Sequence, residues 1–146
     1  ALVAASALML GNVLLARRFP LRMGELHEVT QAPFKDLLVA DAPDPEAGPV
    51  AVEMIYRIRP EDTEAFLAVV TLMKGPRQRD GATLWRLYRD LGDPTRWVER
   101  FIVTSWADYL HQRARGTVAD QAVEARLREL VAPDEPVTMQ HYIAER

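Results

Sequence analysis

The first eighteen residues carry the most distinct hydrophobic pattern of the chain. Ala1 to Ala16 contain no charged residue and are mostly apolar, and Arg17 and Arg18 end the run abruptly. As a helix, the run would be about 24 Å long, somewhat short of the ~30 Å hydrocarbon core of a bilayer. The pattern therefore predicts the end of a transmembrane helix over residues 1–18, with further chain before Ala1.

Two other interpretations fit this segment less well. A secretory signal peptide carries its positive charge before the apolar stretch, whereas here the arginines come last. A buried amphipathic helix would show a polar face, but Ser6 and Asn12 are the only strongly polar residues of the run. With Arg17, Arg18 and Arg22 just past the membrane edge, the positive-inside rule predicts that the following chain is cytoplasmic.

Residues 19–49 are predicted to be a linker. Proline occurs five times in this stretch, and the segment DAPDPEAGP over residues 41–49 can hold neither a helix nor a central strand. A short helical turn over residues 34–39 is the regular element expected here. The compact domain is therefore expected to begin at Val50 and to run to Arg146.

Four segments of this domain alternate between apolar and polar residues, as half-buried strands do. They are residues 50–58, 83–90, 96–104 and 137–144. The alternation leaves large apolar side chains on one face of each strand. These segments are therefore predicted to form a single sheet.

Three helices are predicted between the strands. The first covers residues 60–74 and is expected to end at Gly75-Pro76, because proline interrupts a helix interior. The other two cover residues 105–116 and 117–131. Each begins with Ser or Thr followed three residues later by Asp, the spacing of a capping box.

The element order β-α-β-β-α-α-β predicts an α+β fold of the ferredoxin-like type, the dimeric α/β-barrel kind, in which the last two helices act as one crossover. Helices of such a fold cover one face of the sheet. The strand over residues 96–104 nevertheless has Trp97 and Phe101 on one face and Val98 and Ile102 on the other. An uncovered apolar face predicts a homodimer in which two sheets face each other.

Composition and motifs exclude several functions. The chain has no cysteine, which excludes disulfides and thiolate chemistry. The net charge is −3 and the arginines are interleaved with acids, so no nucleic-acid surface is expected. The three histidines, His27, His111 and His141, lack the spacing of a metal site, and no nucleotide-binding or Ser-His-Asp motif is present. We expect no metal, no cofactor and no catalytic residue.

Aromatic side chains are concentrated in the middle of the domain. They are expected either to fill the core and a dimer interface or to line a pocket for an aromatic small molecule. The pocket candidates are Trp85, Tyr88, Trp97, Phe101, Trp106, Tyr109 and His111. Glu53 and Glu99 on the strands are interpreted as cross-strand ion-pair partners of Arg57 or Arg86.

Short motifs occur in a set order along almost the whole chain. They include Arg18-Phe19-Pro20-Leu21, DPEAGPV, VEMIYRI, Asp80-Gly81, Trp85, Arg89-Asp90, Asp93-Pro94, Glu99, Phe101, Ser105-Trp106, Thr117, Asp120 and His141-Tyr142-Ile143. Their order resembles the cytoplasmic tail of bacterial major facilitator superfamily exporters of the enterobactin-exporter-like branch. The resemblance implies a last transmembrane helix, a Pro-rich linker and a small domain like those of antibiotic biosynthesis monooxygenases.

The late helix departs from the resembled pattern. Tyr109 and Arg113 stand where histidines are usual, and His111 stands where arginine is usual. Chemistry that depends on those histidines is therefore not expected in this chain.

The resemblance implies the C-terminal part of a small-molecule, drug or siderophore exporter in the bacterial inner membrane. The domain would lie in the cytoplasm and serve dimerisation, regulation or the sensing of a small-molecule ligand. The alternative is a membrane-anchored, cofactor-independent monooxygenase-like enzyme acting on an aromatic substrate. We favour the transporter-associated domain because no general base is persuasively placed in the sequence.

Overall fold

A computed structural model of the chain describes residues 39–145. The predicted transmembrane end over residues 1–18 and residues 19–38 of the predicted linker lie outside the described residues. Among residues 39–145, no helix has both the length and the apolar character needed to cross a membrane.

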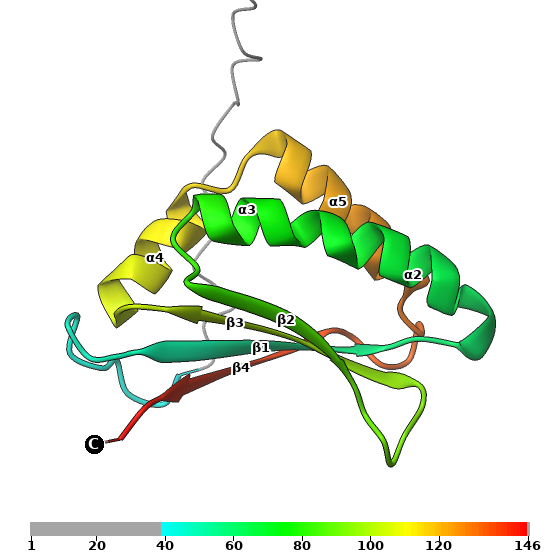
Figure 1. The fold of residues 1–146 in the computed structure, drawn as a ribbon, viewed down its shortest axis with the longest axis horizontal. Coiled ribbons are helices and arrows are strands. Elements are labelled where there is room, and N and C mark those ends of the chain that lie inside the picture. The colour runs from blue at the N-terminus through cyan, green and yellow to red at the C-terminus, as the bar shows by residue number, and fades with distance from the viewer. Residues whose placement is uncertain (1–38, 146) are drawn as a thin grey trace, which may run out of the picture.

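Four antiparallel strands form one sheet (Figure 1). They are β1 (Val50–Arg57), β2 (Leu84–Arg89), β3 (Arg96–Val103) and β4 (Thr138–Ile143). The sheet order is β2-β3-β1-β4, so the first and third strands lie at the centre. This order confirms the predicted ferredoxin-like α+β fold, because both central strands receive a neighbour that is distant in sequence.

The helices lie together on one face of the sheet, and the opposite face is left uncovered (Figure 1). Two short 3₁₀ segments, η2 (Pro60–Asp62) and η3 (Thr71–Met73), flank the first α-helix. The α-helices are α2 (Thr63–Val70), α3 (Lys74–Arg79), α4 (Trp106–Ala114) and α5 (Val118–Leu130).

The expectation that Gly75-Pro76 ends the first helical segment is wrong. The chain passes through η3 and continues as α3 to Arg79. Pro76 lies in the first turn of α3, where a backbone N–H has no intrahelical acceptor, so the missing donor costs nothing there. This continuation places Arg77 and Asp80 over the sheet.

The two predicted capping motifs differ in detail. Thr117 and Asp120 form a complete capping box at the start of α5. At α4, the Ser105 Oγ accepts the backbone N–H of Asp108 at 3.1 Å. The Asp108 carboxylate then accepts the Ser105 hydroxyl at 3.0 Å instead of the Ser105 backbone N–H.

Apolar side chains on the covered face of the sheet form two core clusters. The first contains four apolar side chains of the first helical segment: Phe66, Val69, Val70 and Met73. The second surrounds α4 and includes Trp106 and Tyr109, which pack on Val52, Phe101 and Val103 of the sheet. The alternation of the strands thus places their apolar side chains under the helices.

The end of the predicted linker is fastened to the domain. The backbone N–H groups of Trp106 and Ala107 donate to the carbonyls of Ala47 and Pro45, each at 2.9 Å. These are N-terminal groups of α4, which have no partner within the helix. Gly48 lies so close to the Thr104 carbonyl that a Cβ would collide with it. Residues 44–49 therefore belong to the folded unit, together with the domain expected from Val50 onward.

The uncovered face of the sheet is partly apolar. The half-buried apolar side chains on it are Ala51, Ile55, Leu84, Val98 and Ile102, and Tyr88 and Tyr142 are exposed beside them. One ion pair crosses this face, because the Nε of Arg100 donates to Glu53 at 2.8 Å. The face is therefore a mixed surface, in which apolar side chains are interrupted by the Glu53–Arg100 pair and by further arginines, among them the exposed Arg86.

Replacing Trp106 with alanine is expected to cost about 3–5 kcal/mol of the free energy of unfolding, the range for truncating a buried Trp. Trp106 is 5 % exposed, and its ring contacts those of Tyr109 and His141. Urea denaturation followed by circular dichroism measures the loss. Leu91→Ala, at a side chain that is 94 % exposed, is the control. A loss below about 1 kcal/mol for Trp106→Ala would contradict its role as an anchor of α4.

Candidate functional site

A cavity of about 860 Å³ lies between the sheet and helices α3, α4 and α5. Its apolar lining includes Met54, Tyr56, Met73, Phe101, Tyr109, Leu127 and Met139. Its polar lining includes Arg77, Asp80, Gln112, Arg113, Asp120, Gln121, Glu124 and Arg128. This size and the mixture of apolar walls with a few polar groups are typical of small-molecule sites.

Two of the seven pocket candidates, Phe101 and Tyr109, line this cavity. Trp85, Trp97 and Trp106 are buried in the core. Tyr88 lies on the uncovered face of the sheet and His111 is exposed on α4. Of the predicted set, the structure thus brings only Phe101 of β3 and Tyr109 of α4 together at the cavity.

Glu99 is a fully buried carboxylate that contacts Tyr56 and Arg77, two residues of the cavity lining. It accepts three hydrogen bonds from three different elements. The hydroxyl of Tyr56 on β1 donates at 2.7 Å, the indole N–H of Trp85 on β2 at 3.0 Å, and the Nε of Arg77 on α3 at 3.1 Å. The buried charge is therefore paired and hydrogen-bonded, as burial requires.

The pKa values of its partners reflect this cluster. Burial, and then the negative charge of Glu99, raise the pKa of Tyr56 well above its ordinary value. Burial alone would lower the pKa of Arg77, but Glu99 opposes it, and the pKa of Arg77 lies above its usual range. Tyr56 therefore stays neutral and Arg77 stays charged at neutral pH. The guanidinium of Arg77 also lies 4.7 Å from the ring centre of Phe101.

A second polar group joins α4 to β4. The Tyr109 hydroxyl lies 2.7 Å from the Nε2 of His141, and the Nη1 of Arg113 donates to the Tyr109 oxygen at 3.2 Å. The Met139 sulfur lies 3.2 Å from the same hydroxyl. Tyr109 and Arg113 are the two positions at which this chain departs from the resembled histidine pattern, and both line the cavity.

His141 is kept neutral in this group. Burial, and then the positive charge of Arg113, lower its pKa below the ordinary value. A neutral His141 whose Nε2 carries no proton accepts the Tyr109 O–H. Burial raises the pKa of Tyr109, although Arg113 opposes the shift, so Tyr109 is a neutral donor. The Tyr109 oxygen therefore accepts from Arg113, and its O–H has two acceptors within reach, the Met139 sulfur and an unprotonated His141 Nε2.

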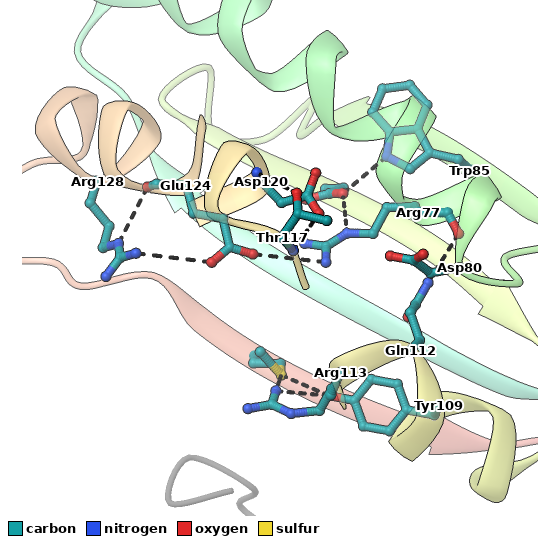
Figure 2. Close-up of polar contacts among 12 residues, drawn as sticks. Arg77, Asp80, Trp85, Tyr109, Gln112, Arg113, Thr117, Asp120, Glu124 and Arg128 are labelled. Carbon is teal, nitrogen blue, oxygen red and sulfur yellow. Dashed lines mark hydrogen bonds and ion pairs between the residues drawn. The ribbon is translucent and has the colours of Figure 1, made fainter. Parts of the chain in front are cut away.

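Helix α5 supplies charged residues along one side of the cavity (Figure 2). The carboxylate of Glu124 lies between Arg77 at 4.0 Å and Arg128 at 3.9 Å. Asp120 pairs with Arg79 at 2.8 Å. Figure 2 shows this row apart from Arg113 and Tyr109, which lie on the other side. Gln112 ties the two sides together, because its Nε2 donates to the Arg77 carbonyl at 3.1 Å.

The ion pairs expected along the strands have other partners. Glu53 does form a cross-strand pair, but with Arg100. Arg57 pairs with Asp93 and Glu135, and Arg86 donates to the Trp85 carbonyl. The partner of Glu99 is Arg77, which sequence reasoning missed because it was expected beyond the end of a helix.

His141, Arg77 and Arg113 join the site although none was a pocket candidate. Arg77 and Arg113 come from helices, and His141 comes from the last strand, 32 residues after Tyr109. Within residues 39–145, no group of three or more His, Cys, Asp or Glu side chains could hold a metal ion. The arrangement is suited to holding an apolar or aromatic molecule that carries a polar group.

Comparisons with known proteins agree with the fold. The sequence profile of a family described as transmembrane secretion effector matches residues 1–146. Rv0793 from Mycobacterium tuberculosis has a similar structure, with a TM-score of 0.57 and 23% identity over 68% of this chain and 97% of that one. No curated protein matches the sequence.

A second similar structure is a candidate antibiotic biosynthesis monooxygenase from Caulobacter crescentus CB15. Its TM-score is 0.59, with 16% identity over 69% of this chain and 93% of that one. A third, given the same description, comes from Nitrosomonas europaea, with a TM-score of 0.57 and 16% identity over 67% of this chain and 91% of that one. The TM-scores of these three structures establish a shared fold.

Stability is expected to fall as the pH is lowered from 7 to 5, in part through His141. Its pKa is lower in the folded chain than in the unfolded one, so the unfolded chain binds the proton first. The loss begins below the ordinary histidine pKa and continues down to the lowered folded pKa. In His141→Gln this contribution disappears, and the fall between pH 7 and 5 is smaller.

Urea denaturation at pH 7, 6 and 5 measures the effect. His111→Gln is the control, because His111 is exposed on the same domain. An equal fall with pH in the wild-type chain and in His141→Gln would show that folding does not lower the pKa of His141.

Proposed function

The chain belongs to the transmembrane secretion effector family, and from that premise we propose that it is the C-terminal part of a major-facilitator-type exporter. In this proposal, residues 1–18 are the end of the last transmembrane helix and residues 50–146 form a cytoplasmic domain, to which residues 44–49 are fastened. The domain binds a small molecule, dimerises and regulates transport. The transport pathway itself lies in helices that precede Ala1.

The observation that carries the ligand-binding role is the cavity of about 860 Å³ under α3, α4 and α5. A domain whose only role was dimerisation would gain stability by filling this space with apolar side chains. Here the space is bordered by buried, oriented polar groups, among them Tyr109 and Gln112. Apolar walls with a few fixed polar groups are what a small-molecule site needs.

A regulatory role is supported by the path of the chain toward the expected membrane helix. Residues 44–49 bind the first turn of α4 through two backbone hydrogen bonds. The same helix carries Tyr109, Gln112 and Arg113 on its cavity side. A ligand that contacts α4 would therefore act on the element to which the linker is attached.

Dimerisation through the uncovered sheet face is supported by its residues. Ile55 and Val98 lie side by side on the two central strands, and Ile102 lies beside Ala51 on the far side of the Glu53–Arg100 pair. Glu53, although on this face, is 7 % exposed because Arg100 covers it. A second copy of the sheet would bury these apolar side chains and the tyrosines beside them, which water contacts in a single chain.

The alternative is a cofactor-independent monooxygenase-like enzyme. It is favoured by the fold shared with proteins of that description and by the Tyr109–His141 hydrogen bond, which could move a proton. Oxygen consumption with an anthrone substrate that disappears in Tyr109→Phe would support this alternative.

A bulky residue at Gln121 is expected to block ligand binding. Gln121 lines the cavity from α5, and Gln121→Trp would place an indole in the space that an aromatic ligand occupies. We expect the affinity for 2-naphthamide, a neutral bicyclic probe, to fall at least roughly tenfold, or ~1.4 kcal/mol. Isothermal titration calorimetry measures it. Ala122→Trp, one residue further along α5 at an exposed position, should bind like the wild-type chain. Equal affinity in both variants would argue against a ligand-binding cavity at this place.

A charge on the uncovered face is expected to separate the dimer. Ile102 is half-buried on β3 and pairs with Leu84 and Ala51 on the neighbouring strands. Ile102→Glu would place one unpaired carboxylate from each copy in the interface, so dimerisation should weaken by at least about tenfold. Sedimentation velocity of residues 39–146 at tens of micromolar measures the mass. Leu72→Glu is the control, because Leu72 is exposed on the helical side. A wild-type monomer, or a dimer unaffected by Ile102→Glu, would contradict this interface.

A further inference from the structure

The charges that border the cavity are paired, with one exception. Asp80, Asp120 and Glu124 each have an arginine nitrogen within 4.0 Å. Among the arginines of the lining, Arg77 pairs with Glu99 and Arg128 with Glu124. Arg113 is the cavity arginine that has no carboxylate within this distance in residues 39–145. The cavity therefore presents one cation whose charge the surrounding chain does not balance.

The guanidinium of Arg113 is also short of acceptors. Both of its hydrogen bonds within residues 39–145 come from Nη1, to the Tyr109 oxygen at 3.2 Å and to the Met139 sulfur at 3.6 Å. A thioether sulfur is a weak acceptor. The Nε of Arg113 is buried without any acceptor. Buried polar groups in folded proteins normally have hydrogen-bond partners. The guanidinium of Arg113 therefore has donors for which the described chain provides no acceptor.

We propose that the cavity binds a small hydrophobic carboxylic acid in its ionised form, with its carboxylate held by Arg113 and its apolar body against Met54, Phe101 and Met139. This inference rests on the proposed ligand-binding function and specifies its ligand class. A carboxylate matches the planar donors of a guanidinium and supplies the charge and the acceptors that Arg113 lacks. Tyr109 and Met139, already in contact with Arg113, fix the place of the guanidinium beside the apolar wall.

Other ligand charges fit this site less well. A neutral aromatic molecule would remove water from Arg113 without replacing the missing acceptors, which disfavours binding. A cationic molecule would need a free carboxylate, but Asp80, Asp120 and Glu124 already have arginine partners. A strongly polar anion would leave the apolar walls without a partner. The combination that satisfies both parts of the cavity is one anionic group on an apolar skeleton.

The test compares two probes of the same shape, 2-naphthoic acid and 2-naphthamide. At pH 7.5 the first is an anion and the second is neutral, so only the charge of the polar group differs. Calorimetric titration uses the 146-residue chain in detergent micelles, with protein-free micelles as the blank. We expect the wild-type chain to bind naphthoate at least about tenfold more tightly than naphthamide, because hydrogen bonds to charged groups are roughly twice as strong as neutral ones.

Arg113→Gln should abolish this preference. It should weaken naphthoate binding by at least about tenfold and change naphthamide binding by less than about twofold, since it removes the charge and leaves the apolar walls. Arg115→Gln, two residues further along the chain at an exposed position, is the matched control and should keep the preference. The wild-type comparison of the two probes needs no variant, so it remains decisive even if Arg113→Gln does not fold.

The outcomes separate this inference from the function on which it rests. Equal binding of the two probes to the wild-type chain, or an equal loss of both in Arg113→Gln, overturns the proposal that the ligand is a carboxylate. It leaves the proposal of a ligand-binding cavity in place. Binding of neither probe overturns both. Preference for naphthoate that disappears in Arg113→Gln and persists in Arg115→Gln supports the carboxylate.

Discussion

The buried carboxylate of Glu99 is the constraint on which the rest of the site depends. It lies on a central strand with no access to water, so each of its oxygens needs a donor from the protein. The donors come from β1, β2 and α3, through Tyr56, Trp85 and Arg77. Each donor is held where the carboxylate needs it. The hydrogen bonds of this polar cluster therefore set the position and orientation of α3 relative to the sheet. In an apolar core, the volumes of the side chains would set them instead.

This constraint also explains why a cavity can persist. Arg77 must reach down from α3 to Glu99, and its stem and guanidinium occupy the floor beside Phe101. Its upper side meets Glu124 of α5 only at 4.0 Å. The helices are therefore linked across the space by charged groups that resist closer packing, because a closer approach would have to desolvate them further. The two faces of the sheet differ: the helices and the cavity lie over one, and the other carries Ile55 and Ile102 without a covering helix.

The sequence allowed the strands and helices to be predicted because their signals are local. Alternation over residues 50–58 and 96–104, and the Thr117–Asp120 spacing, depend only on near neighbours in the chain. The continuation of the helix through Gly75-Pro76 was missed because the cost of a proline depends on its position in the first turn, which the pattern does not reveal.

The candidate site could be predicted only in part, for a related reason. Phe101 and Tyr109 were identifiable as aromatic residues on inward-facing positions. The partners that give the site its chemistry are remote: Arg77 is 22 residues from Glu99, and His141 is 32 residues from Tyr109. Nothing local distinguishes Arg77 or Arg113 from the other arginines of the chain. Their roles follow from the three-dimensional arrangement of α3, α4 and β4.

Helix α4 connects the two ends of the proposed mechanism. At its start, the backbone N–H groups of Trp106 and Ala107 hold the linker carbonyls of Ala47 and Pro45. On its inner side, Tyr109 and Arg113 border the cavity. A ligand can shift the position of an element only by binding its alternative positions with different affinity. Contacts to α4 meet this condition, because any movement of the helix changes both the ligand's contacts and the linker hydrogen bonds. By the reciprocity of coupled equilibria, a pull on residues 44–49 from the membrane side would then alter ligand affinity by the same factor.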